Sequence, residues 1–186
     1  MFQRKALPAN PNRGKKFNHS NLKEIYLAGG CFWGVEAFMA RVPGVADAVS
    51  GYANGNTENP TYEDVCRKDT GHAETVHVTY DPSIIGLDHL LRVFFRIVDP
   101  TTLNCQRNDV GSQYRSGIYY TDPNDKAVAD AIVAEVQKGY NKPVVTEVLP
   151  LRNFTTAEEY HQDYLDKNPG GYCHVDFSLL AELTGK

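Results

Sequence analysis

The order in which strand and helix patterns follow one another is the feature of this sequence that most restricts its fold. Short or alternating apolar runs predict strands, and apolar residues spaced three and four apart predict helices. The patterns predict strands at 24–28, 47–52, 75–80, 117–121 and 144–149, and helices at 33–42, 87–98, 123–137 and 156–166. Because the strands 47–52 and 75–80 follow each other directly, we expect an antiparallel pair. The sequence therefore favours an α+β fold, a two-layer sandwich in which a mixed or antiparallel sheet is covered by helices.

Two of the predicted helices begin with a specific local signal. Pro123 stands at the first position of the helix 123–137, which proline favours because its missing N–H is not needed there. Thr156 and Glu159 have the spacing of a capping box. We therefore place the start of the last helix at Thr156.

Charge is distributed unevenly along the chain. Residues 1–19 contain no acid and five basic residues, and they predict a basic, disordered arm: Arg4, Lys5, Arg13, Lys15 and Lys16. Residues 20–186 are expected to form one catalytic domain with a flexible, cysteine-containing C-terminal segment. Since the whole chain carries a net charge of −4, this domain is acidic, which argues against nucleic acid as a partner.

The distribution of apolar residues argues against a membrane protein. No run approaches the roughly 20 apolar residues that span a bilayer, and the first residues lack the apolar stretch of a signal peptide. We expect a soluble, cytoplasmic monomer without a membrane partner.

Cys31 follows Gly29 and Gly30 at the turn between the strand 24–28 and the helix 33–42. Unpaired backbone N–H groups at a helix start stabilise an anion, so we expect the pKa of this thiol to be lowered and its thiolate to be nucleophilic. The two glycines leave space for a substrate to approach the sulfur. The alternative is a packed core cysteine, which is the commoner situation for this residue type.

The four cysteines stand at positions 31, 66, 105 and 173, with neither a C-x-x-C pair nor the spacing of metal ligands. A disulfide scaffold and a zinc finger are therefore poor interpretations. Cys173 lies in a Gly-Gly stretch after the last helix, where a mobile thiol could attack a sulfenic acid on Cys31. It could instead be a tail cysteine or, together with His174, part of a metal site.

Three further side chains in loops could act on an oxygen atom of a substrate. Glu74 follows TGHA, and apolar walls around it would favour its neutral form, which can deliver a proton. Tyr62 and Tyr114 stand in polar loops, where their hydroxyl groups could donate hydrogen bonds to the same oxygen. The alternatives are a solvated glutamate and two tyrosines at the edge of the core.

Seven motifs carry a resemblance that covers most of the chain. They are GCFWG at 30–34, GYANG at 51–55, NPTYEDVC at 59–66, TGHAE at 70–74, YDP at 80–82, GSQYRS at 111–116 and YHQDYLDKNPGGYC at 160–173. In this order and spacing they resemble the peptide methionine sulfoxide reductases of the A type. The resemblance implies a ferredoxin-like core, reduction of the S epimer of methionine sulfoxide, free or in proteins, and regeneration by thioredoxin. It implies neither a metal nor an organic cofactor.

The resemblance also implies a role for each matching residue. Cys31 would attack the sulfoxide sulfur and become a sulfenic acid, and Cys173 would resolve that acid as a disulfide. Glu74 would protonate the sulfoxide oxygen, which Tyr62 and Tyr114 would hold. The remaining residues would bind the substrate, Phe32 and Trp33 at its methyl group and the others around its backbone: Asp109, His161 and Tyr164.

Two cysteines have no role in this scheme. Cys105 stands four residues before Asp109, and it could replace Cys173 as the resolving thiol. Cys66 is expected to be a core residue. No cysteine follows Cys173, so one resolving step is expected rather than a relay.

Two other classes of function remain open from the sequence. Cys31 with His72 or His161 could form a thiol hydrolase, in which the histidine deprotonates the cysteine. Exposed aromatic residues could instead make the chain a non-catalytic module that binds oxidised peptides.

Overall fold

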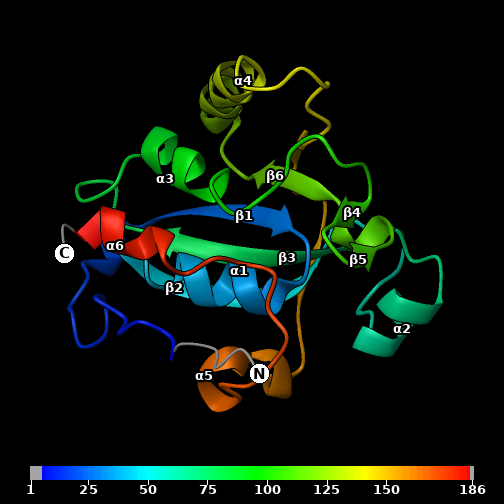
Figure 1. The fold of residues 1–186 in the computed structure, drawn as a ribbon, viewed down its shortest axis with the longest axis horizontal. Coiled ribbons are helices and arrows are strands. Elements are labelled where there is room, and N and C mark those ends of the chain that lie inside the picture. The colour runs from blue at the N-terminus through cyan, green and yellow to red at the C-terminus, as the bar shows by residue number, and fades with distance from the viewer. Residues whose placement is uncertain (1–5, 185–186) are drawn as a thin grey trace.

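A six-stranded mixed sheet forms the centre of the molecule in a computed structural model that describes residues 6–184 (Figure 1). Its strand order is β7-β6-β1-β3-β2-β8. Every neighbouring pair is antiparallel except β6 and β7, which are parallel. The strands are β1 (Lys23–Gly29), β2 (Val45–Ala53), β3 (Ala73–Tyr80), β6 (Ser116–Tyr120), β7 (Glu147–Pro150) and β8 (Phe154–Thr156). A separate hairpin joins β4 (Cys105–Gln106) to β5 (Asp109–Val110).

The helices are α1 (Phe32–Met39), α2 (Tyr62–Arg67), α3 (Leu87–Phe94), α4 (Pro123–Gln137), α5 (Tyr164–Lys167) and α6 (Leu179–Thr184). Three short 3-10 turns, η1 (His19–Asn21), η2 (Ser112–Tyr114) and η3 (Glu159–His161), complete the described elements. The expected α+β fold, with a mixed sheet covered by helices, is confirmed.

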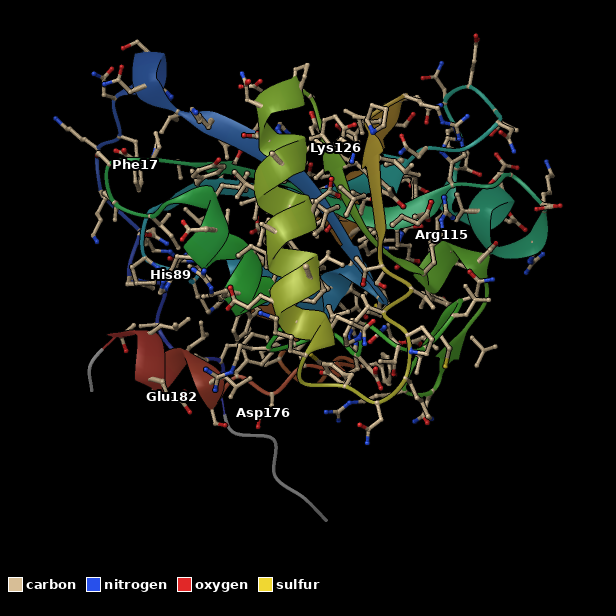
Figure 2. All side chains as sticks on the ribbon, turned by 90° about the horizontal axis from the view of Figure 1, so that it is seen from above. Phe17, His89, Arg115, Lys126, Asp176 and Glu182 are labelled. Atoms are coloured by element: carbon tan, nitrogen blue, oxygen red, sulfur yellow. The ribbon has the colours of Figure 1, made fainter. Side chains whose placement is uncertain are left out.

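Side chains alternate between the two faces of the sheet along the central strands, and the larger apolar ones point to the face that the helices cover. Ile25 and Leu27 of β1 stand opposite Val78 and Val76 of β3, and these side chains belong to the same buried cluster as the apolar residues of α1 and α3. Burying each such side chain contributes about 1.5–3 kcal/mol. Helix α4 lies beside α3 and contacts β6 and β7, as the view from above shows (Figure 2). The sheet thus carries α1 on its covered face, with the first turn of this helix close to the end of β1.

Most predicted elements form with small changes at their ends. The helix 123–137 has the predicted bounds because Asp122 caps it and Pro123 opens it. The helix 87–98 ends at Phe94, and the strand expected at 144–149 is Glu147–Pro150.

The helix predicted at 156–166 is wrong. Thr156 is the last residue of β8 and pairs with Gly51 of β2, so it belongs to a strand rather than to a capping box. Beyond it the chain forms the turn η3, adopts a left-handed conformation at Asp163 (φ 50°), and then makes the short helix α5. The spacing of Thr156 and Glu159 fits a helix cap, but Thr156 pairs instead with the distant Gly51 as part of the sheet.

Asn12, within the segment 1–19 that is predicted to be a disordered arm, contacts the domain. Asn12 is only 7% exposed, and its side-chain amide donates hydrogen bonds to the carbonyl oxygens of Ala40 (2.9 Å) and Val42 (2.8 Å). Its side-chain oxygen accepts from the backbone N–H of Gly44 at 3.1 Å. Residues 1–5 of the predicted arm lie outside the described part of the chain. Its last residue, His19, lies in η1.

Within residues 6–184, none of the helices combines the length and the apolar character needed to cross a bilayer.

Candidate active site

Cys31 is the residue that caps the N-terminus of α1, directly after the end of β1. Gly30 makes the turn with a positive φ of +86°, a conformation that side chains other than glycine rarely adopt. A Cβ atom at Gly30 would also lie 2.7 Å from Cβ of Gln106. The glycine is therefore required both by the backbone conformation and by the close approach of the β4–β5 hairpin.

The pKa of the Cys31 thiol is raised, contrary to the lowered value predicted from its place at a helix start. Cys31 is 8% exposed, and this burial is the largest cause, followed by the charge of Glu74. The backbone N–H of Trp33, in the first turn of α1, lowers the pKa, as the helix start predicts, but this effect is smaller. The thiol is therefore protonated when no substrate is bound.

Glu74 lies in β3 beside the first turn of α1 and is 2% exposed. The backbone N–H of Phe32 donates to its Oε2 at 3.0 Å. Burial raises the pKa of this carboxyl from 4.5 to about 8, the hydrogen bond from Phe32 lowers it, and the charge of Asp109 raises it further. At neutral pH Glu74 therefore holds a proton that it can donate, as the sequence analysis expected from apolar surroundings.

Tyr62 and Tyr114 approach the same carboxyl from two separate loops. Tyr62 is the first residue of α2, whose start is fixed by a capping box between Thr61 and Asp64, and Tyr114 is the last residue of η2. Burial raises the pKa of both phenols, and the charge of Glu74 contributes to both shifts. Both hydroxyl groups are therefore neutral hydrogen-bond donors close to Glu74.

Five ring-bearing side chains form an aromatic wall beside Cys31. The indole N–H of Trp33 donates to Nδ1 of His161 at 2.9 Å, and the indole ring stacks on Tyr164 with 3.7 Å between ring centroids. His161 also contacts the rings of Phe32 (5.0 Å) and Tyr62 (4.6 Å). This wall joins the first turn of α1 to the C-terminal segment of the chain.

Asp109 and Cys173 complete the set of predicted site residues. Asp109 accepts a hydrogen bond from the hydroxyl of Tyr172 at 3.1 Å, and its charge raises the pKa of both Cys31 and Glu74. Cys173 also acts electrostatically on Cys31. A Cβ atom at Gly34 would lie 2.8 Å from its sulfur, so Cys173 packs directly against the first turn of α1. The structure thus brings all ten predicted site residues into one region.

The two histidines of the hydrolase hypothesis are engaged elsewhere. Nδ1 of His161 accepts from Trp33, and Nε2 of His72 lies 2.9 Å from the carbonyl oxygen of Thr57. Neither is among the groups that shift the pKa of Cys31. A cysteine–histidine pair around Cys31 does not form among the residues that the structure describes.

The other two cysteines lie at different places. Cys66 is exposed on α2, so the prediction of a core residue is wrong. The prediction failed because Val65 is the only buried residue of α2. Cys105 is half-buried in β4, and its thiol donates to the carbonyl oxygen of Arg107 at 3.4 Å.

Glu158 is a site residue that the sequence analysis did not identify. Its carboxylate accepts hydrogen bonds from the Tyr52 hydroxyl (2.8 Å) and from the backbone N–H of Tyr62 (3.0 Å). It therefore holds the start of α2 against the segment that carries His161. No local pattern signals this contact, because Glu158 is 106 and 96 residues away from its two partners.

A buried thiol at a helix start, a neutral carboxylic acid beside it and two phenolic donors define a cysteine-dependent enzyme. Among residues 6–184, no group of three or more histidine, cysteine, aspartate or glutamate side chains could hold a metal ion.

Comparisons with known proteins identify the family. A sequence model of the family described as peptide methionine sulfoxide reductase matches residues 23–184. The peptide methionine sulfoxide reductase MsrA of Clostridium perfringens is 60% identical over 154 residues, which cover 83% of this chain and 98% of the relative. The chain belongs to the peptide methionine sulfoxide reductase family.

Two solved structures are similar to this chain in fold. Reduced Mxr1 from Saccharomyces cerevisiae has a TM-score of 0.80 and 41% identity, with 87% of this chain and 93% of that chain covered. Mxr1 from the same yeast in complex with Trx2 has a TM-score of 0.58 and 32% identity, with 82% of this chain and 91% of that chain covered.

Proposed function

We propose that this protein reduces the S epimer of methionine sulfoxide, protein-bound or free, to methionine, and so repairs oxidised proteins. The observation that carries the proposal is the buried, protonated Glu74 beside the helix start that presents Cys31. A sulfoxide oxygen gains negative charge when its sulfur is attacked, and a neutral carboxylic acid next to the nucleophile can protonate it.

In the first step Cys31 attacks the sulfoxide sulfur. Glu74 gives its proton to the sulfoxide oxygen, which Tyr62 and Tyr114 hold by hydrogen bonds, and the proton released by the Cys31 thiol returns to Glu74. The oxygen passes to the Cys31 sulfur as the sulfur–sulfur bond breaks. The products are methionine and a Cys31 sulfenic acid, so the substrate sulfur is reduced and the Cys31 sulfur is oxidised by two electrons.

In the second step Cys173 attacks the sulfenic acid, a disulfide forms between the two cysteines, and water leaves. The contact of Cys173 with the first turn of α1 supports this assignment. A thioredoxin then reduces the disulfide by thiol exchange and restores both thiols. The Saccharomyces Mxr1 solved in complex with Trx2 supports such a partner. No bound cofactor is needed, since the electrons pass only between sulfur atoms.

The aromatic wall supports the assignment of the substrate-binding residues. Phe32 and Trp33 would surround the S-methyl group, whose burial contributes about 0.8 kcal/mol, and the wrong epimer would lose that contact. Asp109, His161 and Tyr164 would contact the backbone around the substrate methionine.

Three wider predictions belong to this proposal. The core is ferredoxin-like in two layers, which is supported by the elements β1-α1-β2-β3-α3-β6 and their strand order β6-β1-β3-β2. The protein acts as a monomer, and it acts in the cytoplasm, where thiols stay reduced.

A thiol titration without reductant tests the proposal. Methionine S-sulfoxide should release one methionine per chain and convert two thiols into a Cys31–Cys173 disulfide, identified by peptide mapping, while the R epimer serves as the control. Cys173→Ser should keep a single turnover but lose cycling with thioredoxin. Cycling that persists in this variant would assign the resolving step to Cys105.

The same experiment distinguishes the other functions. Cleavage of an ester or amide with both thiols intact would establish a hydrolase. Binding of oxidised peptides without any loss of thiols would establish a binding module.

A further inference from the structure

Arg115 is a largely buried cation that the proposed reaction does not use. It stands between η2, which ends at Tyr114, and the start of β6 (Figure 2). Its side chain is 16% exposed. The next residue, Ser116, stands opposite Gly29 at the end of β1, two residues before Cys31. The backbone around Arg115 therefore lies beside the turn that presents the cysteine.

The guanidinium group of Arg115 binds three different segments of the chain. Nη1 donates to the carbonyl oxygen of Ser112 in η2 at 2.9 Å, and Nη2 donates to the carbonyl oxygen of Gly71 at 2.9 Å. Nε forms an ion pair with the carboxylate of Glu147, the first residue of β7. Arginine can hold three partners at once because its planar group carries five N–H donors in a fixed arrangement.

The bond to Gly71 links η2 to the segment that carries the proposed acid. Gly71 stands three residues before Glu74, in the loop that leads into β3, and η2 packs against β3. One guanidinium group thus bonds both to the turn that carries Tyr114 and to the loop that precedes Glu74. The position of the phenol relative to the carboxyl depends on these two bonds.

The carboxylate of Glu147 is itself fixed by the sheet. Glu147 stands opposite Gly117 in the parallel pair of β6 and β7, and it accepts a hydrogen bond from the hydroxyl of Tyr119 at 3.3 Å. An ion pair with a carboxylate held in this way orients the guanidinium group of Arg115. The sheet therefore determines where the other two bonds of Arg115 are made.

We propose that Arg115 is a positioning residue for the reduction: it holds η2 against the loop before β3, so that the hydroxyl of Tyr114 reaches the sulfoxide oxygen that Glu74 protonates. This inference deepens the proposed function and rests on it, because the roles of Tyr114 and Glu74 are assigned there. Arg115 acts through the backbone of η2, since the bonds of its guanidinium group lead to two carbonyl oxygens and a carboxylate.

Single-turnover release of methionine, measured without reductant, provides the first part of the test. Arg115→Ala should slow this release about tenfold at saturating methionine S-sulfoxide, the effect of weakening one hydrogen bond to an oxygen that gains charge. The half-saturating substrate concentration should change little, because that bond strengthens in the transition state. Arg92→Ala, which removes an exposed ion pair with Glu135 on α3, is the matched control and should keep the wild-type rate.

A double-mutant cycle distinguishes positioning of Tyr114 from a general structural role. In a Tyr114→Phe background the hydroxyl is missing, so adding Arg115→Ala should slow the release less than twofold further. In a Tyr62→Phe background the hydroxyl of Tyr114 remains, and Arg115→Ala should keep its tenfold effect. A residue that merely stabilises the fold would have equal effects in the two backgrounds.

The inference is overturned if Arg115→Ala releases methionine at the wild-type rate, or if its effect is the same in both backgrounds. Should Arg115→Ala fail to fold, Arg115→Lys takes its place in the same cycle, because lysine keeps the charge beside Glu147 but cannot make the three bonds together. A wild type that releases no methionine overturns the proposed function and this inference together. Normal release by the wild type with either of the first two results overturns the inference alone.

Discussion

Replacing Glu74 by glutamine should make the protein more stable and at the same time nearly inactive. Glutamine has almost the same volume, and its side-chain oxygen can still accept the hydrogen bond from the N–H of Phe32, which is 3.0 Å long in the wild type. What the variant loses is the proton that the carboxyl delivers. General acid catalysis contributes about 10²–10⁴ in rate, so the single-turnover release of methionine should slow by that factor.

The gain in stability follows from the pKa of Glu74. Because the folded state raises this pKa from 4.5 to about 8, the neutral form stabilises the fold fully below pH 4.5, and that contribution is lost as the pH rises through 8. Each pH unit between these values costs the wild type about 1.4 kcal/mol. Glutamine does not titrate, so at pH 7.5 the variant should exceed the wild type by up to about 4 kcal/mol in free energy of unfolding.

Thermal and urea unfolding at two pH values provide the assay. The difference between the variant and the wild type should be large at pH 7.5 and nearly vanish at pH 5. Glu58→Gln, in an exposed loop, is the matched control and should change neither activity nor stability. Equal stability of Glu74→Gln and wild type at both pH values would refute the reasoning about the buried carboxyl, and a rate within tenfold of the wild type would refute its role as the acid.

Two further substitutions test contacts described above. Gly34→Ala places a Cβ atom 2.8 Å from the sulfur of Cys173 and should therefore displace that thiol. Rapid-quench trapping should show a normal release of methionine, followed by a Cys31–Cys173 disulfide that forms at least about tenfold more slowly than in the wild type. An unchanged rate of disulfide formation would contradict the close packing. Asn12→Ala removes three hydrogen bonds to backbone groups and should lower the free energy of unfolding by about 3 kcal/mol in urea titrations, whereas a disordered arm would give no change.

The sequence predicts those parts of the fold whose causes are local. Helix α4 has its predicted bounds because Asp122 and Pro123 fix its start within two residues. The helix expected from Thr156 fails because Gly51, 105 residues earlier, pairs with that threonine in a strand. A spacing of three residues carries no information about such a partner.

The same distinction between local causes and distant partners applies to the candidate site. The motifs around Cys31, Glu74 and the tyrosines identify the residues, and the structure brings them into one region. The pKa of Cys31 could not be predicted, because the helix start is local whereas burial and the charge of Glu74 arise only in the folded protein. The contacts of Glu158 are likewise tertiary, since they join the C-terminal segment to β2 and α2.

The two edges of the central sheet restrict how a damaged protein can bind. The edge strands β7 and β8 have only four and three residues, and β7 ends in Pro150, which has no N–H to offer. A partly unfolded chain exposes backbone groups that readily extend a long, flat sheet edge. Since neither edge offers such a template, we expect this protein to meet many different damaged chains one side chain at a time, without being drawn into their aggregates.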